Sequence, residues 1–156
     1  MPYTYEYPRP AVTVDIAVFG RKGGERVVLL IERKHAPFEG SWALPGGFVD
    51  ENESLVAAAE RELREETGLT GLVLTQVAAF GDPGRDPRGH TVSIAFVTEA
   101  DVEAAHVAAG DDAAKAEWFR WDALGLGGGA EKGSVRLAFD HDRVLLAARQ
   151  KLEASR

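Results

Sequence analysis

The chain of 156 residues contains no cysteine and a single methionine. The lack of cysteine excludes disulfide bonds and thiolate metal sites, and it fits a protein of a reducing compartment. No apolar run approaches the ~20 residues that a membrane-spanning helix needs. The first residues, MPYTYEYPRP, lack the basic and apolar regions of a secretory signal. We therefore expect a cytoplasmic protein that does not act at a membrane.

Positive charge is also scarce in this sequence. The formal net charge of −7 argues against binding to nucleic acid, because such binding needs a basic surface. The composition, 45% hydrophobic and 28% charged, is otherwise typical of a globular protein. This length predicts one domain over residues 1–156 with a sizeable core. A phosphorylated ligand would need local cations.

The most informative segment spans residues 47–69 and reads GFVDENESLVAAAERELREETGL. Glu62, Glu65 and Glu66 fall at i, i+3 and i+4 of an expected helix over 54–67, so their carboxylates converge on one face. Like charges repel there, and hard divalent cations prefer carboxylate oxygens. The segment therefore predicts a cradle for Mg²⁺ or Mn²⁺. The competing interpretation is a solvated face, which is the usual fate of a charge-dense helix.

The flanks of this helix favour the metal site. Ser54 is a candidate N-cap, Gly68 a candidate C′ residue, and Arg61 stands four residues before Glu65, whose carboxylate it could orient. The pattern G-x5-E-x7-R-E-(apolar)-x-E-E-x-G-(apolar) is matched by Gly47, Glu53, Arg61, Glu62, Leu63, Glu65, Glu66, Gly68 and Leu69. This pattern resembles the Nudix box, the signature of the Nudix hydrolases. So many fixed positions are far more specific than a lone glycine-rich loop.

The rest of the chain contains apolar patterns that predict strands at 11–19, 26–32, 71–80, 91–98 and 116–120. A second helix is expected from Asp140, an N-cap candidate, and the glycine-rich residues 125–133 predict a surface loop. Strands around a central helix, closed by another helix, predict a mixed sheet covered on both faces. The resemblance implies the same α+β fold, an α/β/α sandwich in which the box forms a loop-helix-loop motif.

The resemblance also implies metal-dependent hydrolysis of a nucleoside diphosphate linked to another group. The ligands that it implies are Glu62, Glu65, Glu66 and the backbone carbonyl of Gly46 or Gly47. Glu53 is expected to reach the site through water or a second metal, or else to be only a charge at the helix N-terminus. Arg61 is expected to orient the glutamates rather than to contact the substrate.

The general base remains open between two positions. Asp112 lies in a loop outside the box, shortly before the strand that contains Glu117, and several Nudix branches take the base from such a loop. Asp111 and Glu117 are further candidates, although acidic pairs in loops are mostly solvated turns. Glu65, inside the box, is the competing base.

Residues 81–90, GDPGRDPRGH, form the second distinctive stretch. They are rich in turn residues, yet they also place Arg85 and Arg88 where they could bind phosphate oxygens or stack on a base. Together with residues 37–50 and 137–141, this stretch resembles the ADP-ribose pyrophosphatase branch of the Nudix family.

Aromatic residues add further predictions. Phe38 is expected in the wall of a pocket, as packing or as a contact to substrate. Tyr3, Tyr5 and Tyr7 alternate along an extended arm, which indicates edge packing, stacking on an adenine through Tyr5, or pairing with a second subunit in a homodimer.

The resemblance thus implies hydrolysis of ADP-ribose to AMP and ribose 5-phosphate with Mg²⁺ or Mn²⁺, on a small nucleotide substrate and without nucleic acid. Two alternatives remain. One is a nucleoside triphosphate pyrophosphohydrolase of the sanitising type. The other is a non-catalytic sensor of ADP-ribose, which the intact glutamates make less favourable.

Overall fold

The computed structural model describes residues 2–108, 110, 113–126 and 135–155. Its elements in chain order are β1 Ala11–Lys22, β2 Glu25–Arg33, β3 Trp42–Ala43, β4 Gly46–Phe48, α1 Leu55–Thr67, β5 Thr75–Phe80, β6 Thr91–Glu99, β7 Ala113–Arg120, the 3-10 turn η1 Trp121–Leu124, and α2 His141–Ala154. Neither α1 nor α2 is long and apolar enough to cross a bilayer.

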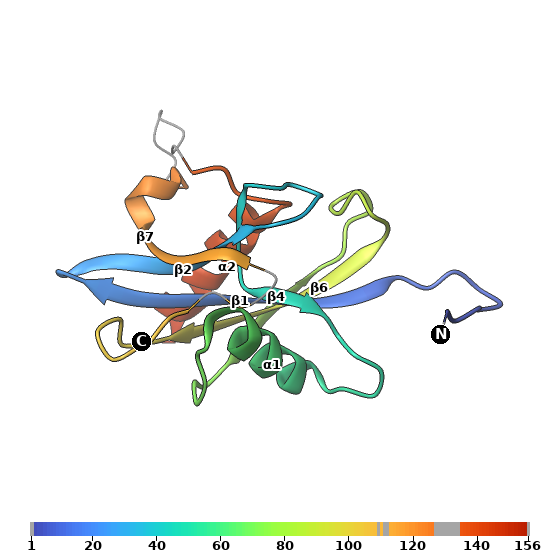
Figure 1. Cartoon of the computed structure of the whole chain (residues 1–156), viewed down its shortest axis with the longest axis horizontal. Coiled ribbons are helices and arrows are strands. Elements are labelled where there is room, and N and C mark those ends of the chain that lie inside the picture. Colours follow the sequence, from blue (N-terminus) through green and yellow to red (C-terminus); the bar gives the residue numbers. More distant parts are fainter. Residues whose placement is uncertain (1, 109, 111–112, 127–134, 156) are drawn as a thin grey trace.

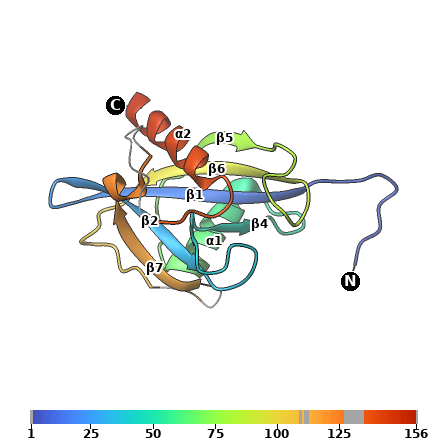
Figure 2. The ribbon, with the colours of Figure 1, turned by 90° about the horizontal axis from the view of Figure 1, so that it is seen from above.

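The described strands form one mixed sheet of seven strands in the order β3-β2-β1-β6-β5, with β4 paired to β1 and β7 paired to β2. β1 and β6 run parallel, with Val14 opposite Ile94, whereas the other pairs are antiparallel. The two helices cover opposite faces of this sheet (Figures 1 and 2). The predicted α/β/α sandwich is therefore confirmed.

Strand β1 is buried from residue 13 to residue 20 because both of its faces are covered. Alternate side chains of a strand point to opposite faces. On the face covered by α1, the core contains Val14, Ile16, Val18, Ala58, Ala59 and Leu63. On the face covered by α2, it contains Ala17, Phe19, Val144, Leu145, Ala148 and Leu152. β1 thus joins two hydrophobic cores.

Helix α1 has both predicted caps. The Ser54 hydroxyl accepts from the backbone N–H of Ala57 at 3.2 Å, and Gly68 ends the helix with φ 79°, donating its N–H to the carbonyl of Arg64. Only glycine adopts that left-handed conformation at no steric cost. These caps fix where the helix begins and ends, and therefore which glutamates face the sheet.

The structure changes several predicted boundaries. β5 begins at Thr75 and not at residue 71, since Gly71 has φ 74° and turns the chain. β3 and β4 were not predicted, because they are too short to show a pattern. Asp140 does precede α2, but its side chain makes no cap hydrogen bond. Most of the glycine-rich surface loop predicted over 125–133 lies outside the described residues.

Removal of the Ser54 cap should destabilise the protein. We expect Ser54→Ala to lower the free energy of unfolding by about 1 kcal/mol, because one amide of the first turn loses its partner. Urea denaturation measures the change, with Thr70→Ala, an exposed threonine beyond the helix, as the matched control. Equal midpoints for both variants would contradict the capping role.

Candidate active site

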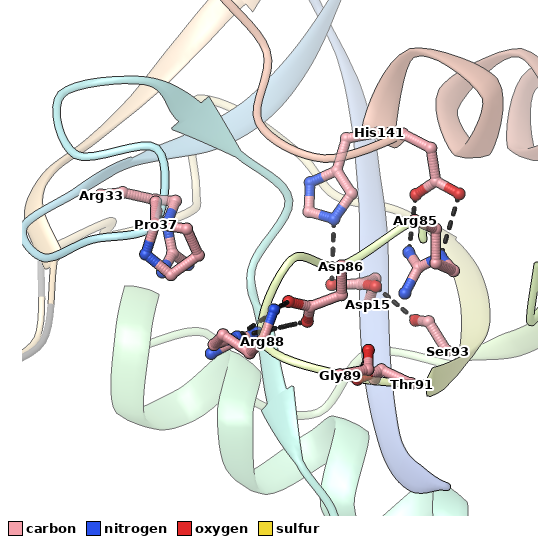
Figure 3. A network of polar contacts seen from close by, with 11 residues as sticks. Asp15, Arg33, Pro37, Arg85, Asp86, Arg88, Gly89, Thr91, Ser93 and His141 are labelled. Carbon is pink, nitrogen blue, oxygen red and sulfur yellow. Dashed lines mark hydrogen bonds and ion pairs between the residues drawn. The ribbon is translucent and has the colours of Figure 1, made fainter. Parts of the chain in front are cut away.

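A cavity of about 430 Å³ opens where the box meets the rest of the fold. Its walls come from β1, β2, β4 and α1, from the β5–β6 loop, and from the first turn of α2. Figure 3 shows part of this wall, with side chains from segments far apart in the sequence. The parallel pairing of β1 with β6 brings the β5–β6 loop beside β1, which explains why it contributes to this cavity.

Glu62 and Glu66 are the box glutamates that line the cavity. Glu66 is 8% exposed, and its Oε2 has no hydrogen-bond partner among the described residues. Burial, together with the adjacent Glu62, raises the pKa of Glu66 to about 9, against the effect of a hydrogen bond from the Gly46 backbone. A buried polar atom without a partner is costly, so this oxygen is a candidate ligand for a cation.

Arg61 holds the other acidic residues of the box. Its Nε donates to Glu53 Oε2 at 2.7 Å, and its Nη1 donates to Glu62 Oε1 at 2.9 Å and to Glu65 Oε2 at 3.3 Å. Its Nη2 donates to the carbonyl of Phe48 at 3.0 Å. The hydrogen bond from Arg61 is the main reason why the pKa of Glu53 falls to about 2. Arg61 therefore orients glutamates and ties α1 to β4.

The roles of Glu62, Glu65 and Glu66 as joint metal ligands stay a prediction. Within the described part of the chain, no three histidine, aspartate or glutamate side chains come close enough to hold a metal ion. The physical reason is that Arg61 pairs with Glu62 and Glu65, while the Glu65 side chain is 55% exposed and does not line the cavity.

The remaining donors nevertheless fit a divalent cation. Glu66 Oε2 is unpaired and buried, and a Cβ at Gly47 would lie 2.5 Å from Glu62 Oε1. The backbone of β4 thus approaches the Glu62 carboxylate as only glycine permits. Oxygen donors of this kind suit Mg²⁺ or Mn²⁺. The residues that would hold the ion are Glu62, Glu66 and the backbone at Gly46 or Gly47.

A buried polar network, which the sequence did not reveal, forms another wall of the cavity. Asp15 accepts a hydrogen bond from the Ser93 hydroxyl, and its Oδ1 lies 3.5 Å from His141 Nε2. The Leu44 N–H donates to His141 Nδ1 at 3.1 Å. Burial alone would raise the pKa of Asp15, but His141, Ser93 and Arg85 outweigh it and lower that pKa. Periodicity could not find this network, because its members come from four separate segments.

Both predicted arginines line the cavity, in different settings. Arg85 makes a two-pronged ion pair with Asp140, at 2.6 and 2.9 Å, and its side chain is 5% exposed. Arg88 pairs with the buried Asp86 at 2.7 Å but remains 41% exposed (Figure 3). The Arg85 guanidinium is therefore buried in its ion pair with Asp140, whereas part of the Arg88 guanidinium stays accessible to a ligand. Their contact with substrate stays a prediction.

Other predicted site residues lie away from the cavity wall. Phe38 packs on Phe139, with ring centroids 4.8 Å apart, and does not itself line the cavity. Tyr5 is half-exposed under Arg9, on an N-terminal arm that projects from the body of the domain (Figures 1 and 2). One chain alone does not bring Tyr5 to the site. Asp112 lies outside the described residues.

The comparisons with known proteins agree with this arrangement. The family model described as NUDIX domain matches residues 9–138. The chain belongs to the Nudix family. An ADP-ribose pyrophosphatase of Methanocaldococcus jannaschii is 42% identical over 139 residues, which cover 89% of this chain and 73% of that protein. The predicted family and its fold are therefore confirmed.

Two further relatives of this Nudix protein are named for a response to ADP-ribose or for a complex with it. An ADPR responsive transcriptional repressor of Acinetobacter baylyi, NtrR, is 36% identical over 94% of the chain, which spans only 56% of the repressor. The solved NUDIX domain of Shewanella oneidensis NrtR, complexed with ADP ribose, is 30% identical with a TM-score of 0.80. That match covers 94% of this chain and 90% of the solved one. The same fold thus occurs in enzymes and in sensors.

The ion pair between Arg85 and Asp140 should stabilise the fold that surrounds the cavity. We expect Arg85→Ala to cost about 3 kcal/mol of unfolding free energy, because the partly buried Asp140 loses its partner. The double variant with Asp140→Ala should recover part of this loss. Chemical denaturation measures both, and the exposed pair Arg143–Asp82, 3.9 Å apart, supplies a control that should change stability by less than ~0.5 kcal/mol. Strict additivity of the two single variants would refute the coupling.

Proposed function

We propose that this Nudix protein hydrolyses ADP-ribose to AMP and ribose 5-phosphate with a divalent cation. Water attacks one phosphorus atom, the diphosphate P–O–P bond breaks, and the water proton passes to a base. The observation that carries the proposal is the buried, unpaired carboxylate oxygen of Glu66, at a cavity that also contains arginines. The similarity to the pyrophosphatase of M. jannaschii supports this choice of substrate.

The two ends of the cavity suit the two parts of such a substrate. Glu62 and Glu66 supply acidic oxygens for Mg²⁺ or Mn²⁺ at one end, and Arg88 supplies a cation at the β5–β6 loop. The cation, when bound, neutralises the diphosphate oxygens and polarises the attacking water. The chain itself binds the nucleotide, orients the glutamates through Arg61, and accepts the proton.

The proton acceptor is proposed to be Glu65 or Asp112. The Glu65 side chain is 55% exposed, and its Oε2 accepts a hydrogen bond from Arg61 Nη1 at 3.3 Å. Asp112 is supported only by its position in the sequence, since it lies outside the described residues. The base requires a pKa near the working pH, so the variants of both residues should be compared across pH.

A non-catalytic sensor is the second candidate, and the repressor relatives favour it. A sensor would bind ADP-ribose tightly and turn it over slowly. The catalytic proposal is better supported because two box glutamates, Glu62 and Glu66, line the cavity beside an ion-paired Arg61. A triphosphate pyrophosphohydrolase uses the same cation chemistry and differs only in the substrate that is cleaved.

We also propose a cytoplasmic homodimer. The arm that contains Tyr3, Tyr5 and Tyr7 exposes these rings by 65%, 49% and 73%. Exposed aromatic side chains on a projecting arm favour contact with a second copy, which would bring Tyr5 near a partner cavity. The absence of cysteine supports the cytoplasm.

Substitution of the two cavity glutamates tests the function. We expect Glu66→Gln and Glu62→Gln to lower kcat on ADP-ribose by at least ~100-fold, because one charged ligand of the cation is lost. The effect is measured as the rate of AMP release in the presence of Mg²⁺ or Mn²⁺, with AMP quantified by chromatography. Glu60→Gln, an exposed position on the same helix, is the matched control and should retain activity.

Thermal melts separate loss of function from loss of fold. The wild type should gain stability from Mg²⁺ or Mn²⁺ by mass action, and the two glutamine variants should gain less. Near-normal turnover by both variants at saturating cation would refute the site. Tight binding of ADP-ribose with no turnover by the wild type would favour the sensor. A preference of the wild type for triphosphates would change only the assigned substrate and leave the cation-dependent chemistry in place.

A further inference from the structure

Two phenylalanine rings approach one guanidinium at the mouth of the cavity. The Arg88 Cζ lies 5.0 Å from the Phe48 ring centroid and 5.4 Å from the Phe139 ring centroid. All three residues line the cavity. Planar guanidinium groups stack on aromatic faces, and the same surfaces stack on flat heteroaromatic rings. This trio is not needed to explain metal binding or hydrolysis.

Arg88 is held rigidly in this position. The buried Asp86 accepts from the Arg88 backbone N–H at 2.9 Å, from Nε at 3.0 Å and from Nη2 at 2.7 Å. Figure 3 shows the two side chains joined by these contacts. The anchor fixes the plane of the guanidinium while the side chain remains 41% exposed. A prepositioned flat cation loses little freedom when it binds a ligand.

Two of the phenylalanines near Arg88 have a backbone conformation that is unfavourable for a bulky residue. Phe139 has φ 53° and Phe38, whose ring it contacts, has φ 60°. Bulky residues rarely adopt this left-handed conformation, and such outliers cluster at ligand clamps. Phe139 packs against a small buried cluster of Ile31, Ala43 and Ala138, whereas Phe38 and Phe48 are 40% and 45% exposed. Packing of the core therefore does not account for the positions of the exposed Phe38 and Phe48 rings.

The trio lies beside the acidic end of the cavity without overlapping it. Gly47, the preceding residue of β4, faces Glu62, and alternation along the strand turns Phe48 to the other side. Arg33 approaches Phe139 from another direction, with its Cζ 5.0 Å from the ring centroid. The Arg88 Cζ lies 5.4 Å from the same centroid, so two cations converge here, and burial together with Arg88 lowers the pKa of Arg33. Such a surface fits a ligand that is both aromatic and anionic.

We propose that Phe48, Arg88 and Phe139 form a stacking site for the base of the nucleotide substrate. This inference rests on the proposed function, and it assigns the base to these residues while the diphosphate lies toward Glu62 and Glu66. The ligand class is a nucleoside phosphate with a flat heteroaromatic base. These side chains would contact the flat face of the base and not its hydrogen-bonding edge. The affinity should therefore differ little between adenine and the other bases.

Substitutions at Phe48 test the stacking site. Phe48→Leu keeps an apolar side chain but removes the ring, whereas Phe48→Tyr keeps the ring and serves as the matched control. With Mg²⁺ present, calorimetry should give a roughly 10-fold weaker Kd for AMP with Phe48→Leu and an unchanged Kd for ribose 5-phosphate. The KM for ADP-ribose should rise by a similar factor, while kcat changes by less than ~3-fold. Phe139→Leu should repeat this pattern.

The outcomes separate this site from the proposed function. If the wild type cleaves ADP-ribose but Phe48→Leu and Phe139→Leu leave the AMP affinity and KM unchanged, the stacking site is wrong and the function stands. If the wild type does not cleave ADP-ribose, the function fails, and fluorescence of Phe48→Trp then decides the site. Quenching by AMP and GMP but not by ribose 5-phosphate supports stacking, whereas no quenching by any of them refutes it.

Discussion

The hydrogen bonds of Arg61 are the interaction on which the site depends. One guanidinium contacts Glu53, Glu62 and Glu65 and also the backbone carbonyl of Phe48. It therefore fixes helix α1 against strand β4, and it orients these three glutamates. Glu66 is the exception, because it is buried and one of its oxygens lacks a partner. A divalent cation would bind this Glu66 oxygen, which Arg61 does not contact.

The geometry of the cavity follows from the central position of β1. This strand pairs with β2, β4 and β6. It therefore brings β4, which lies beside Glu62, close to the β5–β6 loop, which contains Arg85 and Arg88. The first turn of α2 is attached to the same place, through Asp140 with Arg85 and through His141 with Asp15. These contacts hold the cavity wall rigid. A rigid wall suits a site whose chemistry depends mainly on positioning.

The sequence predicted what local spacing determines. Helix α1, its caps at Ser54 and Gly68, and the pairing of Arg61 with Glu65 all follow from residues close together in the chain. The mixed sheet with a helix on each face was predicted as well. Boundaries moved where one glycine turned the chain, as at Gly71.

Contacts between distant segments could not be predicted in the same way. Asp15 meets His141 across most of the chain, and Arg85 meets Asp140 in place of a helix cap. No periodicity encodes such pairs, because they depend on how loops return to the sheet. The three-glutamate cradle stays a prediction for a related reason. Helical spacing placed the carboxylates near one another, but it could not show that the Glu65 side chain would lie away from the cavity wall.

The number of protons released when Mn²⁺ binds tests most directly whether Glu66 is a ligand of the divalent cation. The pKa of about 9 means that this carboxyl holds a proton at pH 7.5, and a metal ligand must give its proton up. Calorimetry in two buffers of different ionisation enthalpy counts the protons. Binding to the wild type should release about one proton at pH 7.5, fewer as the pH passes 9, and none from Glu66→Gln. Equal release by the wild type and Glu66→Gln, or no release by the wild type, would contradict the account.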